Sequence, residues 1–149
     1  MDLIAIVKPS RGVDPGHMVI GQESSDGFSY IGFRFDPEDL PAEFRPAERW
    51  QEYLFSNTVI GFLSDELDFV QGLRRAGAHS FLEKRVPCET PLETVLPPAA
   101  NWKPFANYSF SPNDFHSDAS PCYNCITWAI SVGNKIVPGF LMPVRQGRM

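Results

Sequence analysis

Residues 16–36 read GHMVIGQESSDGFSYIGFRFD and carry the clearest secondary-structure pattern in the chain. Two runs that alternate between apolar and other residues lie on either side of Asp26-Gly27, a dipeptide that favours a tight turn between strands. Alternation with a period of two is typical of strands that bury one face. The stretch therefore predicts a β-hairpin, and its register determines which side chains lie together.

A turn centred on Asp26 and Gly27 places Ser25 opposite Phe28 and fixes every other pair in the hairpin. His17 then lies opposite Asp36 on one face of the sheet. The other face is apolar and carries Met18, Ile20, Phe33 and Phe35. We expect the apolar face to form the core and the face with His17 to form a site.

Weaker patterns outside the hairpin predict the remaining elements. Strands are expected at 3–7, 58–63 and 108–110, because these segments are short, apolar and bounded by turn residues. A helix is expected from a cap at 64–66 to about residue 76, and a last helix from about 123 to 133. Residues 37–57 and 86–104 read as long proline-rich connections, the first with at most one helical turn, and 134–149 as a tail.

Together these elements predict a single α+β domain over residues 1–149. Its antiparallel sheet would be built on the hairpin and the strand at 58–63, and would pack against the last helix. A chain of 149 residues that is 43% hydrophobic is large and apolar enough to bury a core of this kind.

Composition narrows the function classes. A net charge of −5 without a long basic run argues against a nucleic-acid partner. No apolar run approaches the roughly 20 residues of a membrane span, and the N-terminus does not have the pattern of a signal peptide. Three cysteines without a leader indicate reduced thiols in a protein made in the cytoplasm, with export by a leaderless route as the alternative.

Cys125 is the candidate nucleophile. It falls in the first turn of the predicted last helix, where the unpaired N–H groups and the helix dipole stabilise a thiolate. His17 is the candidate base, and Asp36 would orient its imidazole. The alternative is structural: Cys125 as a small buried apolar residue and His17 as a surface residue of a strand.

A family resemblance joins these residues. The strand opened by Gly16-His17, the strand ending in residues 30–36 and the helix start at 123–129 together resemble the circularly permuted papain-like hydrolases of the NlpC/P60 superfamily. In these proteins, which include the lecithin retinol acyltransferase-like and PPPDE-type groups, the histidine precedes the cysteine. The resemblance spans residues 16 to about 139 and implies a permuted papain-like fold.

The resemblance also implies roles for individual residues. Cys125 would be the nucleophile, His17 the base and Asp36 the third catalytic residue, with Glu23 or Tyr30 in its place if the register differs. Substrate contacts are expected from Tyr30, Asn124 and His116. The expected activity is hydrolysis of an amide or ester by a peptidase, amidase or deamidase that needs no metal and no cofactor.

The same resemblance, which includes bacterial toxin and effector domains, implies a protein or peptide substrate and an immunity or host protein as a partner. Two other classes stay open. Cys122-x-x-Cys125 before a helix resembles zinc-dependent cytidine deaminases, although the chain lacks their His-x-Glu motif. Zinc could otherwise be bound by Cys88, His116, Cys122 and Cys125. The chain could also be a binding domain without turnover.

Overall fold

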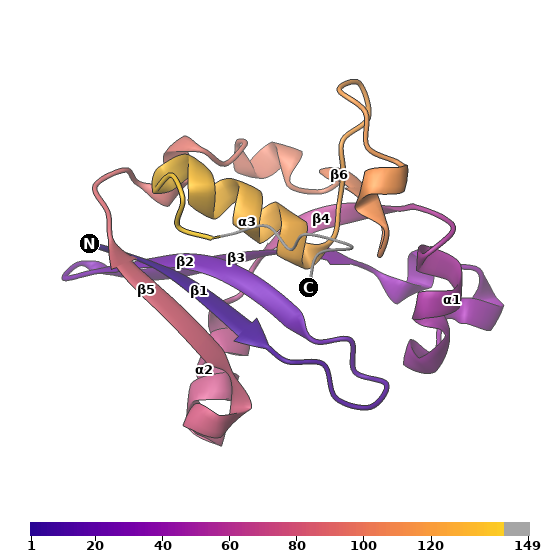
Figure 1. Ribbon diagram of the computed structural model, residues 1–149, viewed down its shortest axis with the longest axis horizontal. Helices are drawn as coiled ribbons and strands as arrows, with labels where there is room; N and C mark the ends of the chain where they lie inside the picture. Colours follow the sequence, from indigo (N-terminus) through magenta and orange to yellow (C-terminus); the bar gives the residue numbers. More distant parts are fainter. Residues whose placement is uncertain (142–149) are drawn as a thin grey trace.

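The computed structural model describes residues 1–141, which form an α+β fold around a curled, mixed sheet of seven strands (Figure 1). The strand order is β5-β1-β2-β3-β4-β6-β7, and every neighbouring pair is antiparallel except β6 with β7. The strands are β1 (Asp2–Lys8), β2 (His17–Ser24), β3 (Gly27–Phe35), β4 (Val59–Asp65), β5 (Leu82–Pro87), β6 (Ala106–Tyr108) and β7 (Cys122–Tyr123). The predicted α+β class is confirmed.

Three α-helices accompany the sheet in the described part of the chain: α1 (Trp50–Leu54), α2 (Leu67–Ala76) and α3 (Cys125–Ile136). Figure 1 shows α3 across one face of the sheet and α2 beyond the other. The connections contain short 3-10 turns at Pro37–Asp39, Ala42–Phe44, Ala47–Arg49, Ala78–Ser80, Leu92–Thr94, Ala99–Asn101 and Pro112–Asp114. No helix of residues 1–141 has the length and apolar character needed to cross a membrane.

The sheet buries apolar side chains on both faces. On the α3 side, Trp128, Val132 and Ile136 pack over the strands within the larger core. On the α2 side, Val70 and Leu73 cover a second core that contains Ile4, Ile6, Val19 and Tyr30. The prediction that the second face is a polar site is therefore wrong for most of its length, because α2 covers it.

The hairpin register differs from the predicted one by two residues. Ser24 pairs with Gly27, so Ser25 and Asp26 form the turn and Gly27, at φ 139°, begins β3. The Asp26 N–H donates to Ser24 Oγ at 3.2 Å, which stabilises this turn. A shift of two residues preserves the faces of the strands, so the core positions were predicted correctly, but it changes every cross-strand partner.

Helix α3 begins two residues after its predicted start, because residues 122–123 form strand β7, and it ends later than predicted. Asn124 caps it in a reciprocal pair with Thr127: the Thr127 N–H donates to Asn124 Oδ1 at 2.8 Å, and the Asn124 N–H donates to Thr127 Oγ1 at 3.0 Å. The helix continues through Gly133, where a Cβ would lie 3.2 Å from the Phe140 ring. Gly133 thus permits close packing and does not end the helix. Residues 142–149 of the predicted tail lie outside the described residues.

Strand β5 was not predicted. Its centre, Glu83-Lys84-Arg85, is exposed and charged, so it lacks the apolar alternation that reveals a strand. It lies at the edge of the sheet beside β1, where charges discourage pairing with another chain.

Candidate active site

The candidate site lies where β2 and β3 separate. Their ladder runs from the pair Ser24–Gly27 to the pair Ile20–Ile31, while β3 continues to pair with β4 as far as Phe35. Residues 17–19 of β2 are therefore released from β3, and the N-terminus of α3 faces them. The backbone N–H of Met18, in the released segment, interacts with the Cys125 thiolate and lowers its pKa.

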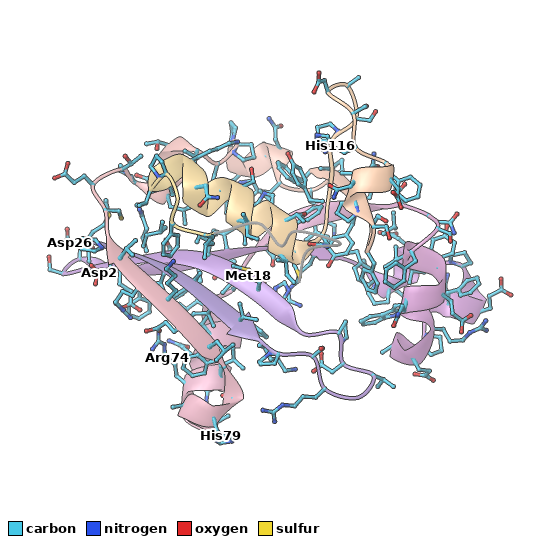
Figure 2. All side chains as sticks on the ribbon, viewed as in Figure 1. Asp2, Met18, Asp26, Arg74, His79 and His116 are labelled. Carbon is cyan, nitrogen blue, oxygen red and sulfur yellow. The ribbon has the colours of Figure 1, made fainter. Side chains whose placement is uncertain are left out.

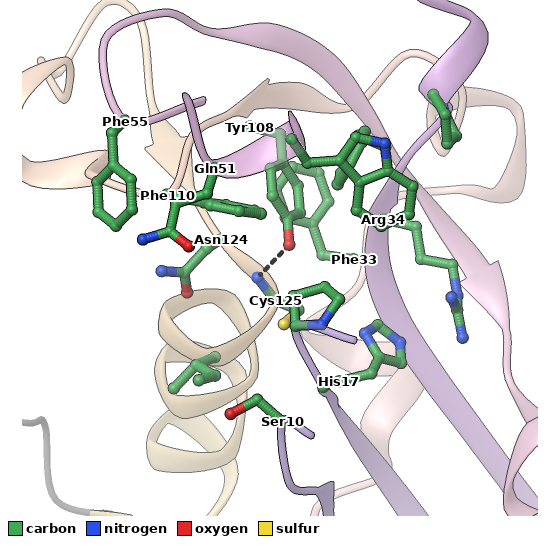
Figure 3. A pocket seen from close by; sticks show the side chains of 16 residues that line it. Ser10, His17, Phe33, Arg34, Gln51, Phe55, Tyr108, Phe110, Asn124 and Cys125 are labelled. Carbon is green, nitrogen blue, oxygen red and sulfur yellow. Dashed lines mark hydrogen bonds between the residues drawn. The ribbon is translucent and has the colours of Figure 1, made fainter. Parts of the chain in front are cut away.

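A pocket of about 560 Å³ opens over this junction. Cys125 and His17 both line it, as do Asn124, Tyr108 and Arg34. Figure 3 shows Cys125 at the start of α3 between His17 and the side chains of Tyr108 and Phe110. The structure thus brings together the predicted nucleophile and the predicted base, which are 108 residues apart in the numbering.

The carboxylate that contacts His17 belongs to Glu66. His17 Nε2 lies 3.0 Å from Glu66 Oε1, so Nδ1 is the ring nitrogen left for Cys125. Glu66 is only 3% exposed, and Arg34 donates to its two oxygens at 2.5 and 2.8 Å. Ser64 Oγ donates to Glu66 Oε1 at 2.9 Å. A buried carboxylate with this many donors is ionised and held in one orientation.

The His17–Glu66 contact passes over Gly32 of β3. A Cβ at residue 32 would lie 2.6 Å from Glu66 Oε1 and 2.9 Å from His17 Nε2, closer than nonbonded atoms approach. The absence of a side chain here allows residues of β2 and of the β4–α2 junction to meet across the intervening strand. Phe69 of α2 supports the pair from one side, with its ring 5.1 Å from that of His17.

Replacing Gly32 with alanine should separate His17 from Glu66. Overpacking of this kind costs about 1–3 kcal/mol, so the free energy of unfolding in urea should fall by that amount. Gly72→Ala is the matched control. It makes the same chemical change on the surface of α2, where the nearest atom to the new Cβ is 3.9 Å away, and should raise stability by about 0.5–1 kcal/mol. A Gly32→Ala protein as stable as the wild type would contradict this account of residue 32.

The surroundings favour an ion pair between Cys125 and His17. Burial alone opposes a thiolate, but His17, the Met18 N–H and the Tyr108 hydroxyl outweigh burial and lower the pKa of Cys125. Burial also opposes an imidazolium, but Cys125 and Glu66 outweigh it and raise the pKa of His17. Each partner thus favours the charged form of the other, which is the arrangement a nucleophilic cysteine requires.

Tyr108 places a hydroxyl beside the nucleophile. The backbone N–H of Cys125 donates to Tyr108 Oη over a long 3.4 Å, and Tyr108 is 5% exposed. Burial and the nearby Cys125 charge raise the pKa of Tyr108 well above its ordinary value, so the hydroxyl keeps its proton. An O–H and an N–H therefore lie beside the sulfur, which are the donors that an oxyanion needs.

Asp36 is not the partner of His17. Its carboxylate instead accepts from the Glu38 N–H at 2.9 Å and caps the 3-10 turn that follows β3. The error follows from the hairpin register and from the early separation of β2 and β3. Glu66 lies in the position beside His17 that was predicted for Asp36.

The predicted substrate contacts are divided by the structure. Asn124 lines the pocket. Tyr30 lies on the α2 side, where its hydroxyl contacts Glu23 and accepts from Arg74 at 3.2 Å, so neither Tyr30 nor Glu23 belongs to the pocket. His116, labelled in Figure 2 on the loop before α3, accepts from the Cys122 N–H through Nδ1 at 3.2 Å and does not line the pocket.

Several residues of the site were missed from the sequence. Glu66 was interpreted as part of a helix cap, and Ser64 and Tyr108 were not assigned to the site. Arg34 was placed on the face expected to form a site but was given no role. Two signals were present in the sequence. Ser64-Asp65-Glu66 places carboxylates where a strand passes into a helix, and a glycine interrupts β3. Neither feature identifies the strand beside which Glu66 lies.

The other two cysteines do not join the site as ligands. Cys122 is 2% exposed, and burial raises the pKa of its thiol. Cys88 Sγ accepts from Gln22 Nε2 at 3.3 Å, near the opposite end of β2 from His17. Among residues 1–141, no three His, Cys, Asp or Glu side chains converge in a way that could hold a metal ion.

Comparison of the chain with protein-family models, with curated proteins and with solved structures found no match.

Proposed function

We propose that the protein is a thiol hydrolase in which Cys125 attacks the carbonyl carbon of an amide or ester. One observation carries the proposal: Cys125 begins α3 at a pocket and faces His17, whose other ring nitrogen lies 3.0 Å from the buried Glu66 carboxylate. Nucleophile, base and orienting carboxylate in that sequence of contacts form the arrangement that thiol hydrolases use.

The first half of the reaction forms a thioester. His17 Nδ1 takes the thiol proton, and the Cys125 thiolate adds to the carbonyl carbon while the carbonyl electrons move to oxygen. The Tyr108 O–H donates to this oxyanion, and the Cys125 N–H gives up its long contact with Tyr108 Oη to donate to the oxyanion as well. When the oxyanion collapses, the bond to the leaving nitrogen or oxygen breaks, and the His17 imidazolium donates its proton to the leaving group.

The second half regenerates the enzyme. His17, again neutral, takes a proton from water as the water oxygen adds to the thioester carbon. Collapse of the second oxyanion breaks the carbon–sulfur bond, and the imidazolium returns its proton to the Cys125 sulfur. Glu66 keeps its charge throughout, because His17 and Arg34 outweigh the effect of burial and lower its pKa to about 2.

We also propose that the fold is that of the permuted papain-like hydrolases. It is supported by a sheet whose histidine strand precedes the cysteine helix in the chain, and by the packing of that helix across the sheet. Under this assignment the enzyme is a peptidase, amidase or deamidase. A bacterial toxin or effector setting, with an immunity or host protein as partner, follows from the resemblance alone.

Acylation by p-nitrophenyl acetate tests the proposal. The reagent transfers an acetyl group to an activated nucleophile, so we expect an acetyl thioester on Cys125 in acid-quenched peptide maps, and release of nitrophenol beyond one equivalent. Cys88, half-buried in the same chain, is the internal reference. Equal acetylation of Cys88 and Cys125, or sustained nitrophenol release by a Cys125→Ser protein, would contradict the proposal.

A further inference from the structure

The pocket beside Cys125 has an aromatic wall, which we define as the side chains of Phe35, Trp50, Phe55, Tyr108 and Phe110. Their rings form a continuous chain of contacts. The centroid of Phe35 is 5.1 Å from that of Trp50 and 5.0 Å from that of Tyr108, and Phe110 is 5.9 Å from Phe55. Rings packed in this way make a rigid apolar surface.

The wall runs from the solvent to the nucleophile. Phe55 is 46% exposed, and Ile126 in the first turn of α3 is 41% exposed, so both lie where the pocket opens. Tyr108 forms the inner end, with its hydroxyl beside the Cys125 N–H. The segment 37–57, expected to be a long connection, supplies Trp50 and Phe55 to this wall.

The pocket has little charge with which to recognise a charged substrate. Among the described residues that line it there is no carboxylate, and apart from His17 the one ionisable basic side chain is Arg34. Arg34 is bound through two nitrogens to Glu66, so its charge is already paired. An ionised group entering the pocket would lose water and meet charged groups that are already paired, whereas an apolar group would gain burial.

Two amide side chains also line the pocket. Asn124 uses Oδ1 to accept from the Thr127 N–H, which leaves its NH₂ group as a donor. Figure 3 shows Gln51 on the same side of the pocket, near Phe55 and Phe110. Primary amides both donate to and accept from peptide groups, but a hydrocarbon chain can form no hydrogen bond with them. These groups favour a peptide over a lipid acyl chain.

The position of the base determines which half of the substrate meets the wall. His17 protonates the leaving group, so the leaving group lies toward His17. Figure 3 shows His17 on one side of the Cys125 sulfur and Phe110 and Phe55 on the other. The acyl half of the substrate therefore extends along the aromatic wall.

On the basis of the proposed hydrolase function, we propose that the substrate is a peptide or peptide-like amide whose acyl residue carries a bulky, uncharged side chain, with aromatic side chains preferred. The aromatic wall binds that side chain, and Asn124 and Gln51 bind the peptide groups beside it. Trp50, Phe55 and Phe110 are then the residues that determine specificity.

Acetyl-aminoacyl chloromethyl ketones test this inference, because each alkylates Cys125 faster when its side chain binds beside that residue. Phe, Ala, Glu and Lys derivatives would be compared by the rate of Cys125 labelling in peptide maps. Each rate is divided by that of iodoacetamide on the same protein. Burial of a large apolar side chain stabilises the complex by about 1.5–3 kcal/mol, so the Phe reagent should label about 10- to 150-fold faster than the Ala reagent. The Glu and Lys reagents should be no faster than the Ala reagent.

The iodoacetamide rate distinguishes failure of the proposed substrate class from failure of the proposed hydrolase function. Fast labelling of Cys125 by iodoacetamide, with equal normalised rates for all four ketones, would overturn the substrate class and leave the hydrolase standing. Labelling of Cys125 no faster than that of Cys88 by iodoacetamide would overturn both. A decanoyl chloromethyl ketone that outpaces the Phe reagent would overturn the peptide assignment in favour of a lipid acyl chain.

Two exposed phenylalanines provide a matched pair of variants. Phe55→Ala removes the outer end of the wall, while Phe28→Ala removes a ring that is 54% exposed in the β2–β3 hairpin, away from this pocket. The Phe-to-Ala rate ratio should fall several-fold in Phe55→Ala and stay at the wild-type value in Phe28→Ala. Equal ratios in the two variants would overturn the role of the wall.

Discussion

Replacement of His17 with alanine should lower the rate of Cys125 alkylation by iodoacetamide at neutral pH by at least about tenfold. A free thiol has a pKa of about 8.5 and is only a few per cent thiolate at neutral pH. In the wild type, His17 contributes to a Cys125 pKa below the ordinary value. Without His17 the burial of Cys125 opposes the thiolate, so the pKa should rise above that of an exposed thiol.

The pH dependence of the Cys125 alkylation rate should differ between the wild type and His17→Ala. In the wild type the alkylation rate should hold as pH falls below the ordinary thiol range, because His17 becomes an imidazolium and stabilises the thiolate. In His17→Ala the rate should fall steadily as the pH is lowered through the same range. Each rate is read by peptide mapping against Cys88, a half-buried thiol that does not line the pocket.

His116→Ala is the matched control. His116 contacts the Cys122 backbone and does not line the pocket, so its removal should leave the pH profile of Cys125 unchanged. Equal losses of Cys125 reactivity in the two variants would mean that any disturbance near the start of α3 slows alkylation, whichever histidine is removed. Full reactivity in His17→Ala would remove His17 from the mechanism.

Local sequence patterns predicted which residues lie in the core and that Cys125 lies at the start of a helix. Met18, Ile20 and Phe33 were assigned to one face and are buried there, because alternation with a period of two records the face of a strand. Cys125 was assigned to the first turn of a helix and is its first residue. The cap that Asn124 and Thr127 form at this point is a local pattern as well, but it was not used in that prediction. Both signals are contained within a few neighbouring residues.

Contacts between distant segments could not be read in the same way. The third member of the site depends on β4 pairing with β3 so that Asp65 faces Ile31, and on Gly32 leaving space for Glu66 to reach His17. Strand order and inter-strand register are set by the packing of the whole sheet, not by the local sequence. The hairpin register was local, but Ser25-Asp26 and Asp26-Gly27 compete as turns, and the wrong choice led to Asp36.

Glu66→Gln should lower the free energy of unfolding at neutral pH by about 2–3 kcal/mol. Hydrogen bonds to a charged group contribute about 1.5–3 kcal/mol, and breaking a buried ion pair leaves its partner unpaired. Arg34, with its side chain 37% exposed, can turn toward water and limits the loss. His17, with its side chain 9% exposed, cannot do so. Urea unfolding followed by tryptophan fluorescence measures the difference.

Asp36→Asn is the matched control for this substitution. It also exchanges a carboxylate for an amide, but at a capping position where asparagine serves as well as aspartate. We expect a change of no more than a few tenths of a kcal/mol. A larger loss of unfolding free energy in Asp36→Asn than in Glu66→Gln would favour Asp36, which the sequence predicted as the partner of His17. It would contradict the role given to Glu66.

The pH dependence of the difference between Glu66→Gln and the wild type is the sharper test. Burial alone would raise the pKa of Glu66, but His17 and Arg34 outweigh it and lower the pKa from 4.5 to about 2. Between these values the unfolded chain binds more protons than the folded one, so wild-type stability rises with pH across that interval. The advantage of the wild type over Glu66→Gln should therefore be complete above pH 4.5 and shrink as pH falls toward about 2. A difference that stays constant over this interval would show that Glu66 stabilises the fold by its shape and not by its charge.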